Sequence, residues 1–180
     1  MRIIAGSAGG IKLKSIKSRQ VRPTLDRVKE ALFNMLGQSI LDSVFLDLYA
    51  GFGGIGIEAL SRGAKKVDFV EKNRKFASII KRNLNKTNLI NFGEIYCEDV
   101  YNFLQKTSTQ YDIIFMDPPY NKGYVKKTIN IILENRILNS RGLIVIETAS
   151  DEKIDLGKKF QMIRERKYGS SQIYIYKLSL

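Results

Sequence analysis

The sequence contains no histidine among its 180 residues. Histidine is the commonest general base in enzymes, the commonest metal-binding side chain, and the central member of Ser-His-Asp triads. Its absence excludes imidazole from all three roles. Any chemistry that this protein performs must therefore proceed without an imidazole group.

Cysteine is almost as scarce, because Cys97 is the only one. One thiol cannot form an internal disulfide, nor can it supply the several ligands of a cysteine metal cluster. Cys97 ends the apolar run Ile95-Tyr96-Cys97, so we expect it to be a buried structural thiol. Without histidine or a cysteine cluster, we expect no metal site.

Long apolar segments are also missing. No stretch reaches the roughly 18 apolar residues of a membrane-spanning helix, and the N-terminus lacks the apolar core of a secretion signal. We therefore expect a cytoplasmic protein with no membrane partner. A composition of 44% hydrophobic and 27% charged residues fits one globular domain over residues 1–180, which we expect to be a monomer.

Acidic residues are absent from the first 25 positions, although the whole chain carries a formal net charge of +12. A basic surplus suits a polyanionic partner, and a concentrated one indicates a patch rather than a solubilising mixture. We expect residues 1–24 to form a basic extension that contacts phosphate, with a merely solvated N-terminus as the alternative. Its basic residues are Arg2, Lys12, Lys14, Lys17, Arg19 and Arg22.

Apolar runs of strand length alternate with helical patterns along most of the chain. This alternation predicts an α/β fold in which a mostly parallel sheet is covered by helices on both faces. The expected strands span residues 44–49, 66–71, 93–97, 113–117 and 143–147. The expected helices span residues 54–62, 74–85, 100–106 and 124–135.

Further elements are expected at both ends of the chain. Apolar residues from Leu25 to Leu36 recur at helical spacing after Thr24, which is a suitable N-cap. Residues 2–5 and 10–13 flank a glycine-rich stretch and predict a basic N-terminal hairpin. Residues 162–168 and 172–178 flank Gly169 and predict a C-terminal antiparallel hairpin.

A glycine-rich loop follows the first strand of the expected sheet. Gly51, Gly53 and Gly56 match a dinucleotide-binding fingerprint, and Glu71 lies about 20 residues downstream, where a ribose-binding acid is typical. Glycines let the backbone approach a ligand closely, and the acid accepts hydrogen bonds from ribose hydroxyls. The loop alone does not distinguish NAD from S-adenosylmethionine.

Two other acids favour S-adenosylmethionine. Asp47 lies four residues before Gly51, where a carboxylate would attract the cationic methionyl end of that cofactor and repel a pyrophosphate. Asp99 ends the third strand, where it could accept a hydrogen bond from the adenine amino group. Each acid could singly be a helix cap or a surface charge, but ligands of open α/β sheets gather where these strands end.

The most informative motif is Asp117-Pro118-Pro119-Tyr120, at the end of the fourth strand. The prolines must stop the strand and present rigid carbonyl groups beside the glycine loop. If Asp117 and the Pro118 carbonyl each accept an N–H from an aromatic amine, its lone pair turns toward the methyl donor. Asp117 can then take up the proton, and Tyr120 can stack on the base. The sequence predicts methylation of an exocyclic amine on a nucleic-acid base.

The sequence resembles the RsmD family of bacterial ribosomal RNA methyltransferases over residues 1 to about 148. The resemblance rests on the opening Arg2-Ile3-Ile4-Ala5-Gly6, the block Arg22 to Asn34, the glycine loop with Glu58 to Ala64 after it, and Asp117 to Tyr120. It implies a class I S-adenosylmethionine-dependent methyltransferase fold, Rossmann-like, with seven strands. It also implies methylation of guanine N2 in 16S ribosomal RNA, with the small ribosomal subunit as partner.

The same resemblance assigns RNA holding to the basic N-terminal region, including Lys12, Lys14, Arg19, Arg22 and Arg27. Three features depart from the family pattern. Residues 7–12 replace the usual aromatic or Arg-Gly near the first turn, Lys29 replaces an arginine, and Phe52 stands where a small residue is common. These departures concern RNA docking and the glycine loop, and leave the expected reaction unchanged.

Three alternatives remain open. A DNA adenine-N6 methyltransferase would use the same tetrapeptide, although such enzymes generally carry a target-recognition region that does not fit here. A nicotinamide-dependent oxidoreductase would explain the glycine loop and Glu71 while leaving Asp117 to Tyr120 without a role. A non-catalytic RNA-binding module would use only the basic face.

Overall fold

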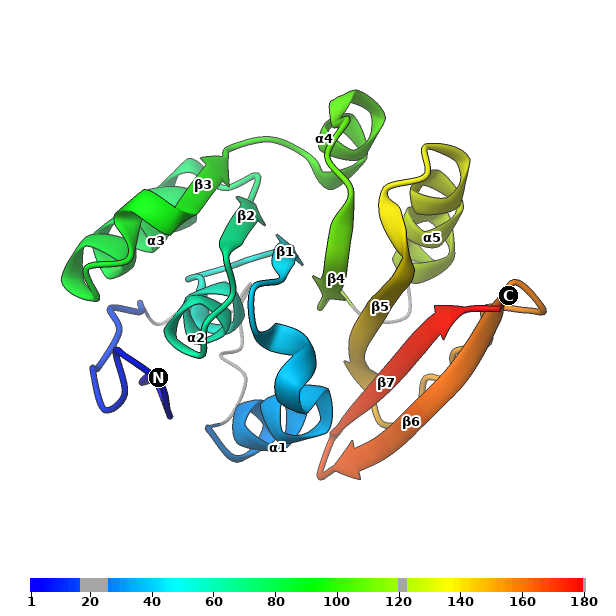
Figure 1. The fold of residues 1–180 in the computed structure, drawn as a ribbon, viewed down its shortest axis with the longest axis horizontal. Helices are drawn as coiled ribbons and strands as arrows, with labels where there is room; N and C mark the ends of the chain where they lie inside the picture. Colours follow the sequence, from blue (N-terminus) through cyan, green and yellow to red (C-terminus); the bar gives the residue numbers. More distant parts are fainter. Residues whose placement is uncertain (17–25, 120–122, 180) are drawn as a thin grey trace.

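A seven-stranded sheet in the order β3-β2-β1-β4-β5-β7-β6 forms the centre of the computed structural model (Figure 1), which describes residues 1–16, 26–119 and 123–179. Its strands are β1 (Val44–Leu48), β2 (Lys66–Val70), β3 (Gly93–Tyr96), β4 (Tyr111–Met116), β5 (Leu138–Ala149), β6 (Phe160–Tyr168) and β7 (Ser171–Leu178). The helices are α1 (Asp26–Leu36), α2 (Gly54–Ser61), α3 (Arg74–Lys86), α4 (Val100–Lys106) and α5 (Tyr124–Glu134), with short 3-10 turns at Gly37–Ile40 and Ile90–Phe92.

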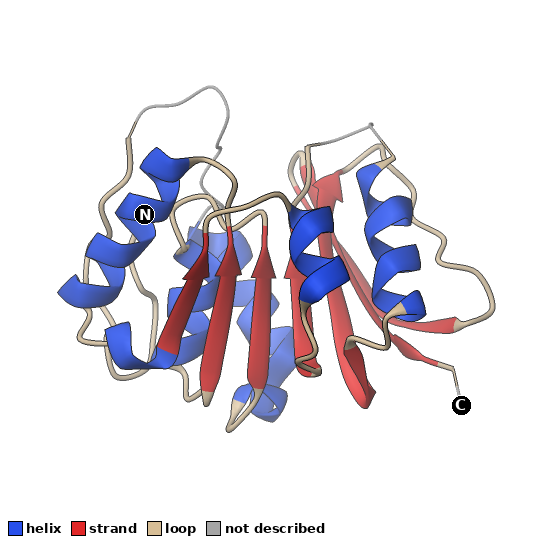
Figure 2. Cartoon of the chain, turned by 90° about the horizontal axis from the view of Figure 1, so that it is seen from above, coloured by secondary structure: helices blue, strands red, loops and turns tan. Residues whose placement is uncertain are grey.

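The strands β1 to β5 are parallel, so their carboxyl ends share one edge of the sheet. Figure 2 shows the arrowheads of neighbouring strands along this edge. The predicted strands and helices are confirmed to within a few residues. The largest difference is at β5, which begins at Leu138 and not at the expected Leu143. The strand starts earlier because buried Leu138 pairs with Tyr111, and a shift in register separates this pair from the one between Ile113 and Leu143.

The C-terminal hairpin is confirmed. Strand β7 runs antiparallel to both β5 and β6, and Gly169 at the turn has a φ of +59°, a conformation that glycine adopts without steric cost. These strands complete the expected mostly parallel sheet with an antiparallel pair at one edge. Strand β6 is the edge strand, and most of its side chains are exposed.

Helices cover both faces of the sheet because its buried strands are apolar on both sides. One face packs against α1, α2, α3 and the N-terminal segment, through residues such as Phe45, Phe69 and Ile113. The other packs against α4 and α5, through residues such as Leu46, Ile114 and Ile144. Figure 1 shows α4 and α5 on one side of the sheet and α1 and α2 on the other.

The expected N-terminal hairpin forms but is shorter than predicted, because backbone hydrogen bonds join residues 1–3 to residues 10–13 around an antiparallel bridge between Arg2 and Lys12. Residues 1–16 are also hydrogen-bonded to α2 and α3. Ser61 shows this clearly: its hydroxyl donates to the Ala5 carbonyl at 2.6 Å and accepts from the Ala8 N–H at 3.0 Å. The proposed N-cap Thr24 lies outside the described residues.

Cys97 is exposed, so the expectation of a buried structural thiol is wrong. Strand β3 is an edge strand that ends at Tyr96, one residue before the thiol. Even within β3 the side chains are only partly covered or exposed. An apolar run at a sheet edge is therefore not evidence of full burial.

Candidate active site

The strand register places the glycine loop beside the Asp-Pro-Pro segment. Leu48, at the end of β1, pairs with Met116 at the end of β4. Tyr49 and Asp117 are the next residues after these two strands, so the segments that they begin leave the sheet side by side. Glu71 follows β2 and Asp99 lies shortly after β3 at the same edge. The parallel sheet thus gathers the four predicted acids, Asp47 included, along its carboxyl edge, where open α/β sheets bind ligands.

The glycine loop has a backbone that only small residues accommodate easily. Gly51 and Gly53 have φ values of +56° and +78°, in the left-handed region. Tyr49 shares this conformation, with φ of +60°, although it carries a bulky side chain. A Cβ on Gly56 would lie 2.3 Å from the Phe69 ring, so Gly56 allows α2 to pack closely on β2. The fingerprint glycines therefore serve the turn and the helix packing.

Phe52, the unusual bulky residue of this loop, is accommodated by α3. Its buried ring meets Phe76 edge-on, with ring centroids 5.1 Å apart, and Ile79 completes this small cluster. The Phe52 carbonyl accepts a hydrogen bond from the Asn83 side chain at 3.0 Å. These contacts fix the loop to α3.

Asp47 is buried within β1 and supports the first turn of α2. Its Oδ2 accepts the Gly56 N–H at 2.9 Å. Burial raises the pKa of this carboxyl to about 7, because desolvation outweighs the hydrogen bond from Gly56, and the nearby Glu71 charge adds to the rise. Asp47 therefore sits beneath the loop as a carboxyl that is readily protonated.

This elevated pKa makes stability depend on pH. Between the unfolded-state pKa of 3.8 and the folded value of about 7, the folded protein retains a proton that the unfolded chain releases. The free energy of unfolding therefore falls as pH rises through this window. Asp47→Asn keeps an acceptor for Gly56 and cannot ionise, so the free energy of unfolding of wild type should fall by about 3 kcal/mol relative to that of the variant between pH 4 and pH 7. The free energy of unfolding is measured for both proteins by denaturation at several pH values in this range. If it changes equally with pH in the two proteins, Asp47 does not titrate in this way.

Glu71 joins the glycine loop to the start of α3. Its two oxygens accept the Gly51 N–H at 2.9 Å and the Asn73 N–H at 2.8 Å. Burial raises its pKa, and these hydrogen bonds oppose the rise. A carboxylate has about four lone-pair positions, so Glu71 retains capacity to accept hydroxyl groups of a ligand.

Asp99 is the N-cap of α4, where its Oδ1 accepts the Tyr101 N–H at 2.9 Å. The sequence left open that Asp99 is a helix cap, and one of its oxygens has this role. Asp117 is half-buried just beyond β4, Pro118 is buried and Pro119 is exposed. Tyr120, the fourth residue of the motif, lies outside the described residues.

Three tyrosines with no role predicted from the sequence lie along the same edge. Tyr124, at the start of α5, lies 6.4 Å from both Tyr49 and Tyr101, measured between ring centroids. The Tyr49 hydroxyl bonds to the Thr128 hydroxyl at 3.2 Å, and the Lys127 ammonium lies 3.9 Å from the centre of the Tyr101 ring. An aromatic residue directly after a strand, or in the first turn of the next helix, is the sequence signal that could have indicated them.

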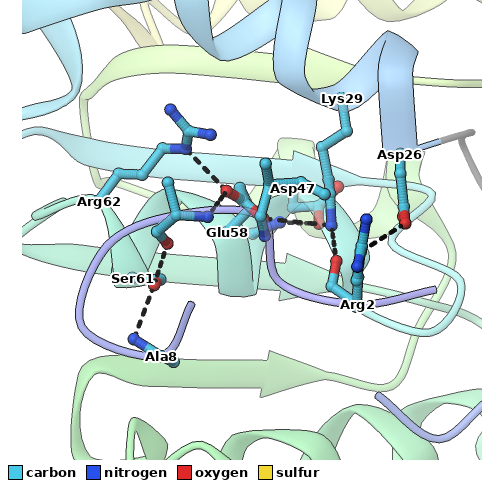
Figure 3. Close-up of polar contacts among 11 residues, drawn as sticks. Arg2, Ala8, Asp26, Lys29, Asp47, Glu58, Ser61 and Arg62 are labelled. Carbon is cyan, nitrogen blue, oxygen red and sulfur yellow. Dashed lines mark hydrogen bonds and ion pairs between the residues drawn. The ribbon is translucent and has the colours of Figure 1, made fainter. Parts of the chain in front are cut away.

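The predicted RNA-binding residues are placed in part. Lys12, Lys14 and Arg27 are exposed, whereas Arg19 and Arg22 lie outside the described residues. Residues 1–16 are held on the protein by a buried charge cluster around Glu58 (Figure 3). Lys12 and Lys14 therefore extend from an anchored segment.

Glu58 on α2 is fully buried and has four partners. Its carboxylate accepts the N–H groups of Ile4 and Ala5 at 2.8 and 3.1 Å, and it pairs with Lys29 at 3.2 Å and with Arg62 at 2.7 Å. Lys29 is itself buried and also donates to the Arg2 carbonyl. Burial lowers the pKa of Lys29, and Glu58 opposes that effect. Lys29 thus ties α1 and the N-terminal segment to α2.

Within residues 1–16, 26–119 and 123–179, no group of three acidic or cysteine side chains could hold a metal ion. No helix in these ranges is long and apolar enough to cross a membrane.

Comparison with known proteins identifies relatives along nearly the whole chain. The family described as "Conserved hypothetical protein 95" matches residues 1–177. YlbH of Bacillus subtilis is 38% identical, with 98% of each chain covered. Ribosomal RNA small subunit methyltransferase D of Haemophilus influenzae is 36% identical, with 98% of this chain and 93% of the relative covered.

The fold has an equally extensive match. The solved structure of yhhF from Escherichia coli has a TM-score of 0.90 and 32% identity to this chain, and covers 99% of this chain and 98% of its own. The sheet order and the C-terminal antiparallel pair are the ones expected for the family to which the relatives point. The chain belongs to the RsmD family, with the seven-stranded α/β fold expected from its sequence.

Proposed function

We propose that this protein transfers a methyl group from S-adenosylmethionine to guanine N2 in small-subunit ribosomal RNA, as a cytoplasmic monomer. The pairing of Leu48 with Met116 carries the proposal, because it sets the glycine loop next to Asp117 and Pro118. A methyl donor on the loop and an amine on the Asp-Pro segment would then be neighbours. Family membership supports the ribosomal substrate, and so does the name of the Haemophilus influenzae relative, ribosomal RNA small subunit methyltransferase D.

The residues along the edge fit S-adenosylmethionine. Glu71 would accept ribose hydroxyls, Asp99 would accept the adenine amino group, and the backbone at Gly51 and Gly53 would admit the ligand closely. Asp47 and Glu71 place buried acids next to the loop, which suits a cationic ligand better than a pyrophosphate. When bound, this cofactor supplies an electrophilic methyl group on a sulfonium.

Asp117 and Pro118 would prepare the acceptor. The Asp117 carboxylate and the Pro118 carbonyl would each accept an N–H of guanine N2, and so aim its lone pair at the methyl group. Once the nitrogen has accepted the methyl group, with the sulfur keeping the electron pair of the broken carbon–sulfur bond, the surplus proton would pass from nitrogen to Asp117 or to water. Tyr120 would stack on the base, and the tyrosine cluster supplies further aromatic surface nearby.

Glu71→Ala tests the cofactor assignment. Losing buried hydrogen bonds to ribose should weaken S-adenosylmethionine binding by about 1–3 kcal/mol, roughly 5- to 150-fold in Kd. The matched control is Glu94→Ala, which removes an exposed glutamate from β3 and should leave the Kd unchanged. Isothermal titration calorimetry measures both. Equal affinities for the two variants would remove Glu71 from the cofactor site.

The acceptor is tested by offering methyl-labelled S-adenosylmethionine with unmodified small ribosomal subunits or with duplex DNA. The proposal predicts label in the subunits and none in DNA. Label in DNA alone would favour the adenine-N6 alternative. Tight NADH binding with no response to S-adenosylmethionine would favour an oxidoreductase, and a protein that binds RNA but transfers no label would be a binding module.

A further inference from the structure

The solvent-facing side of α3 is strongly basic. The exposed residues of this helix are Arg74, Lys75, Ser78, Lys81, Arg82, Asn85 and Lys86, which we call the α3 face. The helix has five basic residues and no acidic residue. Its opposite side is buried against the sheet and the N-terminal segment.

This arrangement is electrostatically unfavourable for the helix itself. Arg74 and Lys75 lie in the first turn, where the helix dipole favours acids. Arg82 and Lys86 are like charges four residues apart, a spacing at which opposite charges stabilise a helix. The ion pairs among the described residues involve none of the five basic side chains. A solvated helix face normally mixes both signs of charge, so the α3 face suits an external anion.

The N-terminal segment extends this basic surface. The Lys14 N–H donates to Asn83 Oδ1 at 2.7 Å, and Asn83 Nδ2 donates to the Lys14 carbonyl at 3.0 Å. The Lys86 ammonium donates to the Lys12 carbonyl at 2.8 Å. The exposed Lys12 and Lys14 side chains therefore start from backbone that is fixed to α3, and Figure 1 shows the N-terminal segment beside this helix.

The position of α3 relates the basic surface to the active site. The helix begins three residues after Glu71, at the carboxyl edge of the sheet, and its 13 residues span about 20 Å. The α3 face thus begins near Glu71, at the carboxyl ends of the parallel strands, and runs toward their amino ends. A chain of phosphates could follow it while a base reaches the active site.

We propose that the α3 face, together with Lys12 and Lys14, binds the phosphate backbone of the substrate RNA. This inference rests on the proposed function and adds a specific RNA-contacting surface to it. Basic side chains that contact phosphate contribute affinity without sequence readout, and the released counterions make that affinity depend on salt. The surface should therefore control how tightly RNA binds and leave the methyl-transfer step unaffected.

The test replaces Lys75, Lys81 and Arg82 together by glutamine, which is compatible with a helix. The matched control replaces Lys158, Lys159 and Arg166 by glutamine, which removes the same charges from exposed positions at or beside β6, at the other edge of the sheet. Circular dichroism checks the fold of both variants. Binding of 16S ribosomal RNA is measured between about 50 and 200 mM salt, the range over which phosphate contacts change affinity strongly.

The α3 variant should bind RNA roughly tenfold more weakly, with a salt-dependence slope smaller by about 2, as expected for three lost phosphate contacts. Its KM for small subunits should rise in proportion, while kcat and the Kd for S-adenosylmethionine stay at wild-type values. RNA affinity and slope equal to those of the β6 control would overturn the α3 inference. Because binding is measured separately from transfer, absence of methylation by wild type would count against the proposed function alone.

Discussion

Asp117→Asn should lower kcat for methyl transfer by about 10³-fold or more while the Kd for S-adenosylmethionine changes by less than about threefold. The neutral amide keeps the size of the side chain and one oxygen acceptor, but it loses the charge and cannot take up the proton from the amine. The effect should fall on kcat because Asp117, just beyond β4, is proposed to bind the base that accepts the methyl group and not the cofactor. Single-turnover transfer and calorimetry separate the two quantities.

Asp42→Asn is the matched control for this prediction. Asp42 is exposed and lies just before β1, at the opposite edge of the sheet, with a φ of +56° that asparagine tolerates. It should transfer methyl groups at the wild-type rate. An Asp117→Asn protein that retained more than about a tenth of wild-type kcat would remove this carboxylate from the chemistry.

Glu58→Ala should lower the free energy of unfolding by about 3–5 kcal/mol, because it leaves the buried Lys29 charge without its carboxylate partner. The same change frees the N–H groups of Ile4 and Ala5 and removes a partner from Arg62. For a chain of this size the melting temperature should fall by roughly 6–20 °C. Calorimetry or thermal denaturation followed by circular dichroism measures the change.

Glu98→Ala provides the comparison, because Glu98 pairs with the largely exposed Lys106 at 3.0 Å. Exposed ion pairs contribute at most about 1 kcal/mol, so this variant should melt within a few degrees of wild type. Similar losses for the two variants would show that the Glu58 cluster stabilises the fold no more than a surface pair. Glu58→Ala should also weaken RNA binding, since the N-terminal segment depends on this cluster.

The order of elements and the positions of the four acids followed from the sequence. Strand-length apolar runs that alternate with helical patterns specify a parallel sheet, and the carboxyl ends of parallel strands necessarily share an edge. The glycine loop and the tetrapeptide lie at that edge because each follows a strand directly. Local pattern and chain order were therefore sufficient to place the residues of the proposed site along one edge of the sheet.

Other features depend on contacts between residues that are distant in the sequence. Lys29 and Glu58 are 29 positions apart, and no local pattern marks them as a buried pair. The N-terminal hairpin is short because the N–H groups of Ile4 and Ala5 donate to Glu58 on α2 instead of continuing the pairing. The exposure of Cys97 depends on β3 being an edge strand, which the apolar run around it does not reveal.

The identity of the methylated nucleoside tests the central claim most directly. Wild-type protein is incubated with methyl-labelled S-adenosylmethionine and unmodified small ribosomal subunits, and with naked 16S ribosomal RNA in parallel. The RNA is then digested and its labelled nucleoside is identified by chromatography and mass spectrometry. We predict N2-methylguanosine, formed by wild type and not by Asp117→Asn. A label on a ribose, on a ring carbon or on no nucleoside would contradict methylation of an exocyclic amine at Asp117 and Pro118.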